Sequence, residues 1–591
     1  MSKASLELGG TNWAAKDGNL LGYANGSFVD RYVPREFTFS RGSNLAATRI
    51  NSAGKIEKGR ENLLTYSNTF SSWSVLQITR TSGQSGYDGS NDAWLLTDTA
   101  TSGDHRLYLA NSHSGVNTLS VYAKAGTKSI VYVQSYINNS SIAYFDLSAG
   151  SVLSTAVGID SKIESVGNGW YRCSMAFNNT NTYVTIGIAE SATRSYVGDG
   201  TGTIYIQDAQ LEVGLVATDY IESGATTATA GLLENEPRID YTDGTPSLLL
   251  EPQRVNLVTQ SEYFDGTHWS KQNAILVNTN SHTSPEGIQN ATELDGFDSS
   301  NFQSISQYIT TDAGAYTLSV FLKKTTGALT HYPAVVMGSV YKYVIINSTT
   351  GTYAEATGTN DNDYVKIQNW NDDWWRVIVT NTISAGSQRF AIYPSLSANG
   401  TTLSLSATGT NVFYGAQFEA GSYPTSYIPN HSGGSVTRTA ESFSATGFAD
   451  YLGDSEGTIF IEGEMSQKNG YISLIEGTNS GVSIGVNGGG QFFYIIRDSG
   501  STQGEIAVSN IFTTNTNFKI AGKYKTNDFE LFKDGASIGT DTTGNTFGDG
   551  DLITINSNSV FPADQPFYGR IKQILVFPTA LSDDDCITLT T

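Results

Sequence analysis

The sequence predicts an all-β protein made of several sandwich domains. The chain has 591 residues, with 61 glycines and 32 tyrosines, whereas charged residues make up only 15%. Short segments that alternate apolar and polar residues recur along it, separated by Gly, Asn, Ser and Thr turns, which is typical of antiparallel strands. Leu, Lys and Glu rarely keep a helical spacing for more than two turns. A chain of this length is expected to hold several domains, each able to bury its own core.

One long module occurs twice, and this duplication sets the expected architecture. Four motifs recur in the same order: Asn62-Leu63 as Asn256-Leu257, Leu119-Ser120-Val121-Tyr122 as Leu318-Ser319-Val320-Phe321, Trp170-Tyr171-Arg172 as Trp374-Trp375-Arg376, and Ala209-Gln210-Leu211-Glu212 as Ala416-Gln417-Phe418-Glu419. Their spacing grows steadily along the chain, as expected if the second copy gained short loop insertions. A repeat of this length is a whole domain and not a solenoid unit. Duplication also suggests display, because repeated modules gain avidity for repetitive ligands.

Turn-rich and Gly-rich stretches divide the chain into six segments. The expected boundaries are an N-terminal arm at 1–60, a first module at 61–224, a linker at 225–250, a second module at 251–432, a linker at 433–445 and a third domain at 446–591. The first 60 residues hold too few apolar residues to bury a core alone. We therefore expect them to dock on a partner or on copies of the chain, with disorder as the alternative.

The third domain carries its own strand signals. Phe529 and Leu531 alternate with polar residues before Asp534-Gly535, which predicts a β-hairpin. A late strand is expected from Tyr568 to Phe577, where Pro578 ends it.

The net charge of −22 argues against nucleic acid as a partner, since a binder of phosphate backbones needs a basic face. It also disfavours adhesion to anionic lipid, although its simplest role is to keep a Gly-rich protein soluble. The sequence contains no run of about 20 apolar residues, so it predicts no membrane-spanning segment. Its N-terminus lacks the pattern of a signal peptide. Cys173 and Cys586 fall in different expected domains, so no disulfide framework is expected.

Two families are similar to parts of this sequence. The paired modules, with NLLTYSNTFSSW at 62–73, LSVYAKAG at 119–126, GWYRC at 169–173 and AQLEVG at 209–214, resemble the jelly-roll carbohydrate-binding-module-like domains of tailed-phage virion proteins. The segment from Phe37 to Asn51 looks like a lead-in common in phage tail fibres. The third domain, with ELFKDGASIG at 530–539 and FYGRIKQILVFPTALSDDD at 567–585, is similar to concanavalin-A-like (laminin-G-like) lectin domains.

The resemblance implies two tandem jelly-roll sandwiches followed by one concanavalin-like sandwich. It also implies a bacteriophage fibre of the tail or head, made in the host bacterial cytoplasm and located in the virion. Such a protein mediates host adhesion by binding cell-surface glycan without catalysis, assembles as a homotrimer and contacts other virion proteins through its N-terminal arm. Two alternatives stay open: a purely structural capsid or tail decoration protein, and a spike that depolymerises glycan.

Aromatic residues supply the candidate ligand-binding positions. Trp73, Trp170, Trp269 and Trp374 recur beside apolar strands, so we expect them in the cores. Tyr132 and Tyr136 lie four residues apart on one expected strand and therefore share a face. Trp375 takes the place of Tyr171 in the other copy and is expected to be partly exposed. Receptor-binding residues are thus predicted at Tyr132, Tyr136 and Trp375.

Carboxylates give one metal candidate and no catalytic site. Related jelly rolls often hold structural calcium through an Asp on the last strand, which the resemblance places at Asp208, although the second copy has Gly415 there. No other cofactor is expected. Glu212 and Glu419, retained in both copies, are expected to bind Arg172 and Arg376 or a backbone N–H. Neither two facing carboxylates nor a nucleophile elbow can be singled out, so the chain is not expected to be an enzyme.

Overall fold

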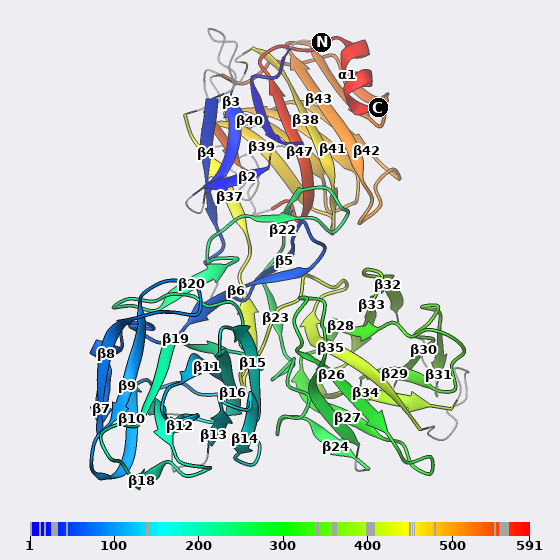
Figure 1. Cartoon of the computed structure of the whole chain (residues 1–591). Helices are drawn as coiled ribbons and strands as arrows, with labels where there is room; N and C mark the ends of the chain where they lie inside the picture. The colour runs from blue at the N-terminus through cyan, green and yellow to red at the C-terminus, as the bar shows by residue number, and fades with distance from the viewer. Residues whose placement is uncertain are drawn as a thin grey trace. The chain divides into compact units, whose positions relative to one another are not determined.

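The computed structural model describes residues 3–591 except 11–12, 17–18, 25–32, 43–44, 137–140, 181, 274, 339–341, 357–362, 398–407, 448–450, 452, 454, 478–479, 549–550 and 555–565. Antiparallel strands dominate the described chain, whose one α-helix is α1 (Asp583–Thr590) (Figure 1). The all-β prediction is therefore confirmed. No helix among the described residues is long and apolar enough to cross a membrane.

The chain divides into two compact units, and each draws on separate stretches of sequence. The terminal unit contains Met1–Lys58, Leu232–Arg254 and Thr437–Thr591, and the tandem unit contains Gly59–Gly231 and Val255–Val436. The tandem unit holds both copies of the duplicated module. We call its strands β7 to β19 module 1 and its strands β24 to β35 module 2.

Module 1 is a sandwich of two antiparallel sheets. The first sheet has the order β14-β13-β12-β17-β10-β18, with β7 also paired to β10, and the second has the order β15-β16-β11-β19-β9-β8. The strands are β7 (Ser74–Leu76), β8 (Ile78–Gln84), β9 (Ala93–Asp98), β10 (Ser102–Ala110), β11 (Val116–Ala125), β12 (Ile130–Tyr136), β13 (Ser141–Asp146), β14 (Ser151–Thr155), β15 (Asp160–Gly167), β16 (Trp170–Asn178), β17 (Tyr183–Ala189), β18 (Ser195–Val197) and β19 (Thr203–Val213). A 3₁₀ turn, η1 (Phe70–Ser72), precedes them.

Module 2 repeats this strand order. Its sheets are β24-β27-β34-β29-β30-β31 and β25-β26-β35-β28-β33-β32. The strands are β24 (Ser270–Gln272), β25 (Leu276–His282), β26 (Ala291–Gly296), β27 (Ser304–Thr311), β28 (Gly314–Lys323), β29 (Tyr332–Met337), β30 (Lys342–Ile346), β31 (Tyr353–Ala356), β32 (Tyr364–Asn369), β33 (Trp374–Ile383), β34 (Gly386–Leu396) and β35 (Gly409–Ala420). The equivalent topologies support the duplication inferred from sequence. The four repeated tryptophans at 73, 170, 269 and 374 are buried, which confirms their predicted burial.

A buried polar network explains why Gln-x-Glu recurs on the last strand of both modules. Glu212 accepts hydrogen bonds from the Thr218 N–H at 2.8 Å and from the Gln210 amide at 2.7 Å. Glu419 accepts the same bonds from the Thr425 N–H at 2.9 Å and from Gln417 at 2.6 Å. Of the two partners expected for these carboxylates, the backbone N–H is confirmed in both copies.

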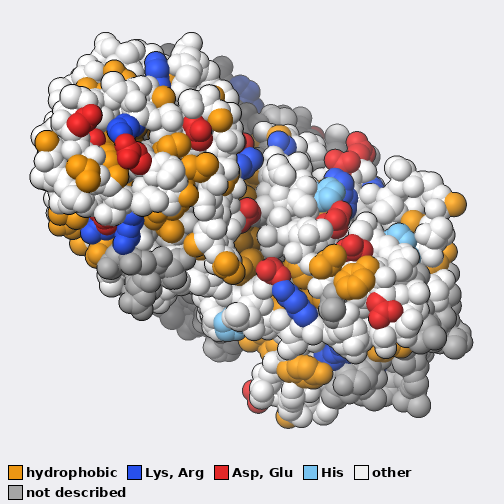
Figure 2. All heavy atoms as spheres, turned by 60° about the horizontal axis from the view of Figure 1, so that its bottom comes forward, with side chains coloured by type: hydrophobic (Ala, Val, Ile, Leu, Met, Phe, Trp, Pro, Cys, Tyr) orange, Lys and Arg blue, Asp and Glu red, His pale blue; other side chains and the backbone are white. Residues whose placement is uncertain are grey.

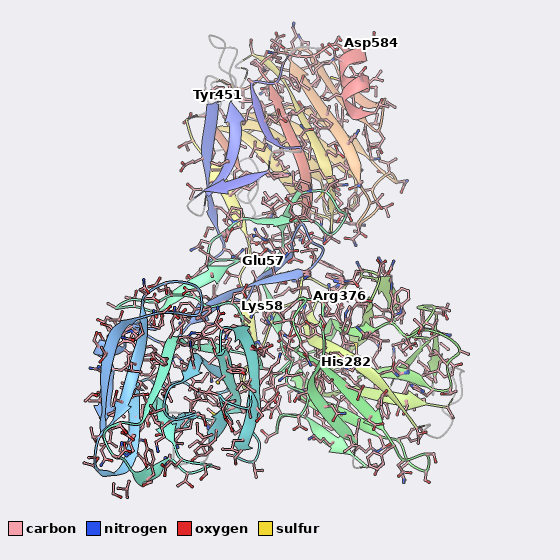
Figure 3. The ribbon with its side chains drawn as sticks, in the orientation of Figure 1. Glu57, Lys58, His282, Arg376, Tyr451 and Asp584 are labelled. Carbon is pink, nitrogen blue, oxygen red and sulfur yellow. The ribbon has the colours of Figure 1, made fainter. Side chains whose placement is uncertain are left out.

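The retained arginines bind other groups nearby. Arg376, labelled in Figure 3, donates to the Thr425 carbonyl oxygen at 2.6 Å and to Ser319 Oγ at 3.1 Å. Arg172 donates to Ser120 Oγ at 3.1 Å. The repeated motif therefore fastens the last strand to the segment that follows it, and its recurrence is accounted for by stability.

The terminal unit is also a sandwich. In one sheet β38 lies between β43 and β47, and β44 and β45 follow β43; in the other, β46, β39, β40, β41 and β42 are neighbours in that order. These strands are β38 (Glu456–Met465), β39 (Gly470–Gly477), β40 (Ser480–Val486), β41 (Phe492–Asp498), β42 (Ser501–Val508), β43 (Phe518–Lys525), β44 (Asp528–Lys533), β45 (Ala536–Asp541), β46 (Leu552–Thr554) and β47 (Gly569–Phe577). The predicted hairpin is confirmed: Asp534 and Gly535, both with positive φ, join β44 to β45.

The N-terminal segment supplies strands to this sandwich and does not form a separate arm. β1 (Leu6–Gly9) pairs with β47, with Leu6 opposite Val576, and β4 (Val33–Ser40) pairs with β37 (Ser442–Ala445). Between them β3 (Asn19–Ala24) pairs with β1, β2 (Ala14–Lys16) and β4. Segments too short to bury a core alone can complete another sheet, because an open strand edge offers unpaired N–H and C=O groups. This corrects the domain boundaries expected from sequence.

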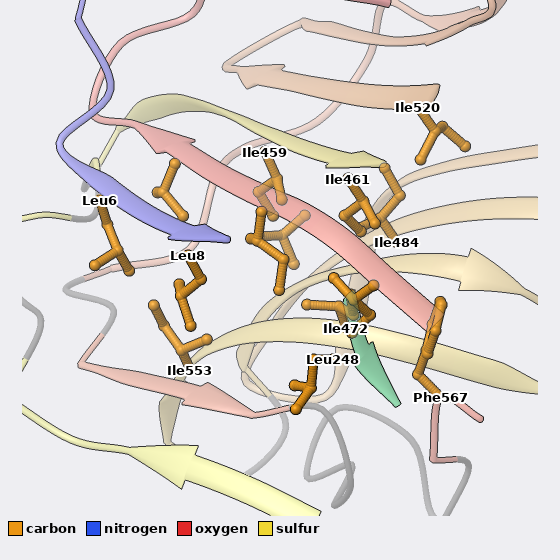
Figure 4. Packing of buried hydrophobic residues seen from close by; sticks show 14 of the residues in the cluster. Leu6, Leu8, Leu248, Ile459, Ile461, Ile472, Ile484, Ile520, Ile553 and Phe567 are labelled. Atoms are coloured by element: carbon orange, nitrogen blue, oxygen red, sulfur yellow. The ribbon is translucent and has the colours of Figure 1, made fainter. Parts of the chain in front are cut away.

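The expected linker at 225–250 also contributes to the sandwich. β21 (Arg238–Asp240) and β22 (Ser247–Leu250) form a hairpin, and β22 pairs with β47, placing Leu248 opposite Ile571. Leu6, Leu8 and Leu248 pack with Ile459 and Ile553 in one buried cluster (Figure 4). The other short strands are β5 (Thr48–Ile50), β6 (Ile56–Asn62), β20 (Ala228–Gly231), β23 (Arg254–Asn256) and β36 (Val436–Arg438).

Buried ion pairs join the three stretches of the terminal unit. Arg238 Nη1 lies 2.7 Å from Glu251 Oε2, and Arg438 Nη1 lies 2.9 Å from the same oxygen. Arg41 Nη1 lies 3.4 Å from Glu441 Oε1, and Arg238 pairs with Glu441 as well. Burial lowers the pKa of Arg41 to about 10, although Glu441 opposes this shift. Removing one partner from such a buried network leaves an uncompensated charge, so the five side chains tie the unit together.

Candidate functional site

The outer face of the first sheet of module 2 carries the most developed candidate site. Alternate residues of a strand point to opposite faces. Ile305, Phe390 and Ile392 point into the core, whereas Tyr308 and Arg389, opposite each other in register, point outward. The sequence of β27 and β34 therefore places polar and aromatic side chains together on the outside of the sandwich.

These outward side chains line a groove of about 440 Å³. Its lining combines aromatic rings, hydroxyl and amide groups, and two cations: Ser270, Lys271, Gln272, Phe302, Ser306, Tyr308, Tyr343, Arg389 and Tyr393. No Asp or Glu is among these described lining residues.

Arg389 is fixed at the centre of this set by uncharged oxygens. Its guanidinium donates to Tyr393 Oη at 2.9 Å, to Ser304 Oγ at 3.2 Å and to Gln272 Oε1 at 3.3 Å. Burial acts to lower the pKa of Arg389, but Tyr393, Tyr308 and Tyr343 together outweigh it, so the pKa lies above its ordinary value. The guanidinium therefore stays charged, and its orientation is set before any ligand arrives.

The tyrosines give the groove a ring surface and neutral hydroxyl groups. Tyr308 is 60% exposed. Tyr393 is buried, and its ring makes an edge-on contact with Phe302, with 6.3 Å between the ring centroids. Tyr343 Oη lies 3.5 Å from Tyr393 Oη, and burial raises the pKa of Tyr343 above its ordinary value. The hydroxyls can thus both donate and accept, next to one ring that is open to a ligand.

The equivalent face of module 1 is closed by its own charges. Arg194 Nε lies 3.3 Å from Asp104 Oδ2, and Arg106 Nη1 lies 3.9 Å from the same oxygen. Arg194 also donates to Gln134 Oε1 at 3.0 Å.

Tyr132, a predicted ligand residue, lies on that closed face and is fully buried. Its ring covers Gly187 so closely that a Cβ there would lie 2.5 Å from a ring carbon. The structure thus places Tyr132 in packing and not on an exposed surface. Tyr136 belongs to β12, but its side chain lies outside the described residues.

Trp375, the third predicted ligand residue, packs on a turn. Its indole Nε1 donates to the Ser348 carbonyl oxygen at 2.8 Å, and a Cβ on Gly351 would lie 2.8 Å from its ring. In module 1, Tyr171 covers Gly150 in the same way. An aromatic residue at this position therefore recurs because it covers the glycine of a hairpin turn.

Asp208, the predicted calcium ligand, occupies a β-bulge. Its φ is 51°, and Gly415 at the equivalent place has a φ of 60°, with an irregular register beside both. Asp and Gly are among the residues that tolerate this left-handed conformation, which accounts for the substitution between copies.

The Asp208 carboxyl group is held by a tyrosine and is largely buried. Tyr87 Oη donates to Asp208 Oδ2 at 3.0 Å, and burial raises the pKa of Asp208 to about 7. Within the described part of the chain, no three His, Cys, Asp or Glu side chains are arranged to hold a metal ion. Calcium at Asp208 stays a prediction.

Sequence reasoning missed the groove residues of module 2. A signal was available, because Arg389 and Tyr393 are four residues apart on one strand and share a face. That spacing singled out Tyr132 and Tyr136 in module 1. The pattern alone could not tell which of the two outer faces is open.

Comparison with known proteins identifies similarity in parts of the chain. Residues 454–586 match the family described as Concanavalin A-like lectin/glucanases superfamily. No curated protein matches the chain.

Three solved structures illustrate the remaining similarities. The CBM40 of a Ruminococcus gnavus IT-sialidase, bound to alpha2,3 sialyllactose, is 21% identical over 23% of this chain and 83% of its own, with a TM-score of 0.21. The CBM22 tandem of Paenibacillus barcinonensis Xyn10C is 12% identical over 61% of this chain and 98% of its own, with a TM-score of 0.20. A tail fiber protein from an E. coli phage is 10% identical over 56% of this chain and 41% of its own, with a TM-score of 0.16.

Proposed function

We propose that this chain binds glycan without catalysis through the groove of module 2. The observation that carries the proposal is the exposed ring of Tyr308 beside the fixed donors and acceptors around Arg389. A sugar presents an apolar C–H face and a rim of hydroxyl groups, and binding sites match such ligands with rings and a few well-placed polar groups. Hydrolysis of a glycosidic bond generally needs two carboxylates, which the described lining does not offer.

The biological setting we propose is a bacteriophage virion fibre that attaches to host cell-surface glycan. The sequence resemblance of both modules to phage virion domains supports this setting. A homotrimer would present three grooves and raise the avidity for a repetitive surface polysaccharide. Because the N-terminal strands are part of the terminal-unit sandwich, attachment to other virion proteins would involve that folded unit and not a free arm.

The experiment is binding of the full chain to host and unrelated bacterial cells, with free surface polysaccharide as competitor. Tyr308→Ala is expected to weaken saturable binding at least about tenfold, since exposed aromatic anchors dominate such contacts. The matched control is Tyr364→Ala, which removes a tyrosine that is 47% exposed on the opposite sheet of the same module.

Equal binding by the two variants would overturn the assignment to this groove. If the unaltered chain bound no cells at all, a structural decoration protein would be the better description. Release of reducing sugar ends from the polysaccharide would instead favour the depolymerising spike.

A further inference from the structure

The groove of module 2 presents positive charge on a strongly acidic protein. The chain has a net charge of −22, and the face in Figure 2 shows acidic, basic and apolar side chains interspersed. Against this background, the described lining of the groove contains Arg389 and Lys271 and no acidic residue. Lys271 pairs with Asp265 outside the lining, so Arg389 supplies the charge that a ligand would meet.

The guanidinium of Arg389 is prepared for an anionic partner. Tyr393, Ser304 and Gln272 hold it with neutral oxygens, which orient the group without cancelling its charge. Nη2 uses both of its hydrogens on Ser304 and Gln272, whereas Nη1 donates one to Tyr393 and has a second that can donate a charge-assisted bond to a carboxylate. Charge-assisted bonds are about twice as strong as bonds to neutral hydroxyls, and Arg389 is only 8% exposed, which reduces screening of its charge by salt.

On the equivalent face of module 1, the protein itself supplies a carboxylate that pairs with arginine. There Asp104 lies within ion-pair distance of both Arg106 and Arg194. The duplicated fold therefore accommodates an arginine–carboxylate pair on this outer face. In module 2 the arginine of this face lies on a different strand, β34, which is the counterpart of β17, and Tyr393, Ser304 and Gln272 orient it with uncharged oxygens.

We infer that the groove of module 2 selects acidic glycans. The carboxylate of a sugar such as a uronic acid binds at Arg389, and the ring of a neighbouring sugar packs on the ring of Tyr308. The inference rests on the proposed function, because it names the class of glycan for the same groove. It assigns Arg389 the role of a specificity-determining residue and Tyr308 the role of a platform that is indifferent to charge.

The test uses the full chain with polygalacturonate, alginate and hyaluronate, each paired with its carboxyl-reduced derivative. At least one acidic polymer is expected to bind at least about tenfold more tightly than its reduced form. Arg389→Gln should bring the ratio of the two affinities to about one, because only the acidic polymer gains a charge-assisted bond from this residue. Arg389→Lys should restore only part of the preference, because lysine keeps the charge but loses the planar group that Tyr393, Ser304 and Gln272 hold in place.

The matched control is Lys366→Gln, which removes an exposed positive charge from β32 on the opposite sheet. It is expected to leave both affinities unchanged, and the melting temperatures of all variants show that each is folded. Equal binding of acidic and reduced polymers, still sensitive to Tyr308→Ala, would overturn the inference and leave the proposed function standing. No binding to any polymer or host polysaccharide would overturn both.

Discussion

Leu248→Ala should destabilise the terminal unit, although Leu248 lies in a stretch whose sequence predicts a linker. Its side chain is fully buried against the strands of the C-terminal sandwich, opposite Ile571. Truncation of a fully buried leucine costs about 2–5 kcal/mol. In a folded unit of about 150–250 residues, each kcal/mol shifts the melting temperature by about 2–4 °C. We therefore expect the transition of the terminal unit to fall by about 4–20 °C.

Calorimetry of the full chain, with hydrogen exchange of peptides from β47, measures this change unit by unit. The matched control is Leu233→Ala in the same stretch, where the side chain is 38% exposed and little loss is expected. Exchange in β47 should accelerate in the first variant only, because β22 and β47 share a sheet. If the two variants unfolded within about 0.5 kcal/mol of each other, residues 232–254 would be a linker after all.

Three further outcomes are expected. Glu419→Ala should lower the unfolding free energy of module 2 by at least about 2 kcal/mol in urea titrations, because buried donors of Thr425 lose their acceptor; a change below about 0.5 kcal/mol would contradict this. The folded pKa of Asp208, about 7, exceeds its unfolded value of about 3.9, so its contribution to stability is complete below pH 4 and lost as pH rises through 7. Asp208→Asn should therefore stabilise module 1 at pH 8 and not at pH 4. If calcium raised the melting temperature of the unaltered chain and not that of the variant, the result would support a calcium site at Asp208. Trp375→Ala should loosen the turn at Gly351 and spare glycan binding; lost binding with unchanged stability would restore its predicted ligand role.

The two modules share a fold but differ at the outer face of the first sheet. The polar network around Glu212 and Glu419 is the same in both copies, because it fastens the last strand wherever the fold occurs. The outer faces differ in how their charges are held: Arg194 pairs with Asp104 in module 1, whereas Arg389 donates to neutral oxygens in module 2. Similar folds therefore do not imply that both modules bind ligand.

The sequence by itself determined the all-β class, the duplication, the buried tryptophans and the hairpin at Asp534-Gly535. Those features follow from local alternation, turn chemistry and repeated motifs, which are visible within short windows of the chain. The boundaries of the terminal unit were not visible in this way. Leu6 and Leu248 each belong to a short apolar segment, and only long-range pairing with β47 assigns them to one core.

The site depended on tertiary structure even more. The sequence placed Tyr132 and Tyr136 on one face of a strand, and the same rule applies to Arg389 and Tyr393. What differs is the neighbouring strands: an ion-paired Asp104 lies on the face of module 1, and an exposed Tyr308 beside neutral oxygens lies on the face of module 2. Strand periodicity determines which way a side chain points, but only packing between distant strands decides whether that face is covered or open to a ligand.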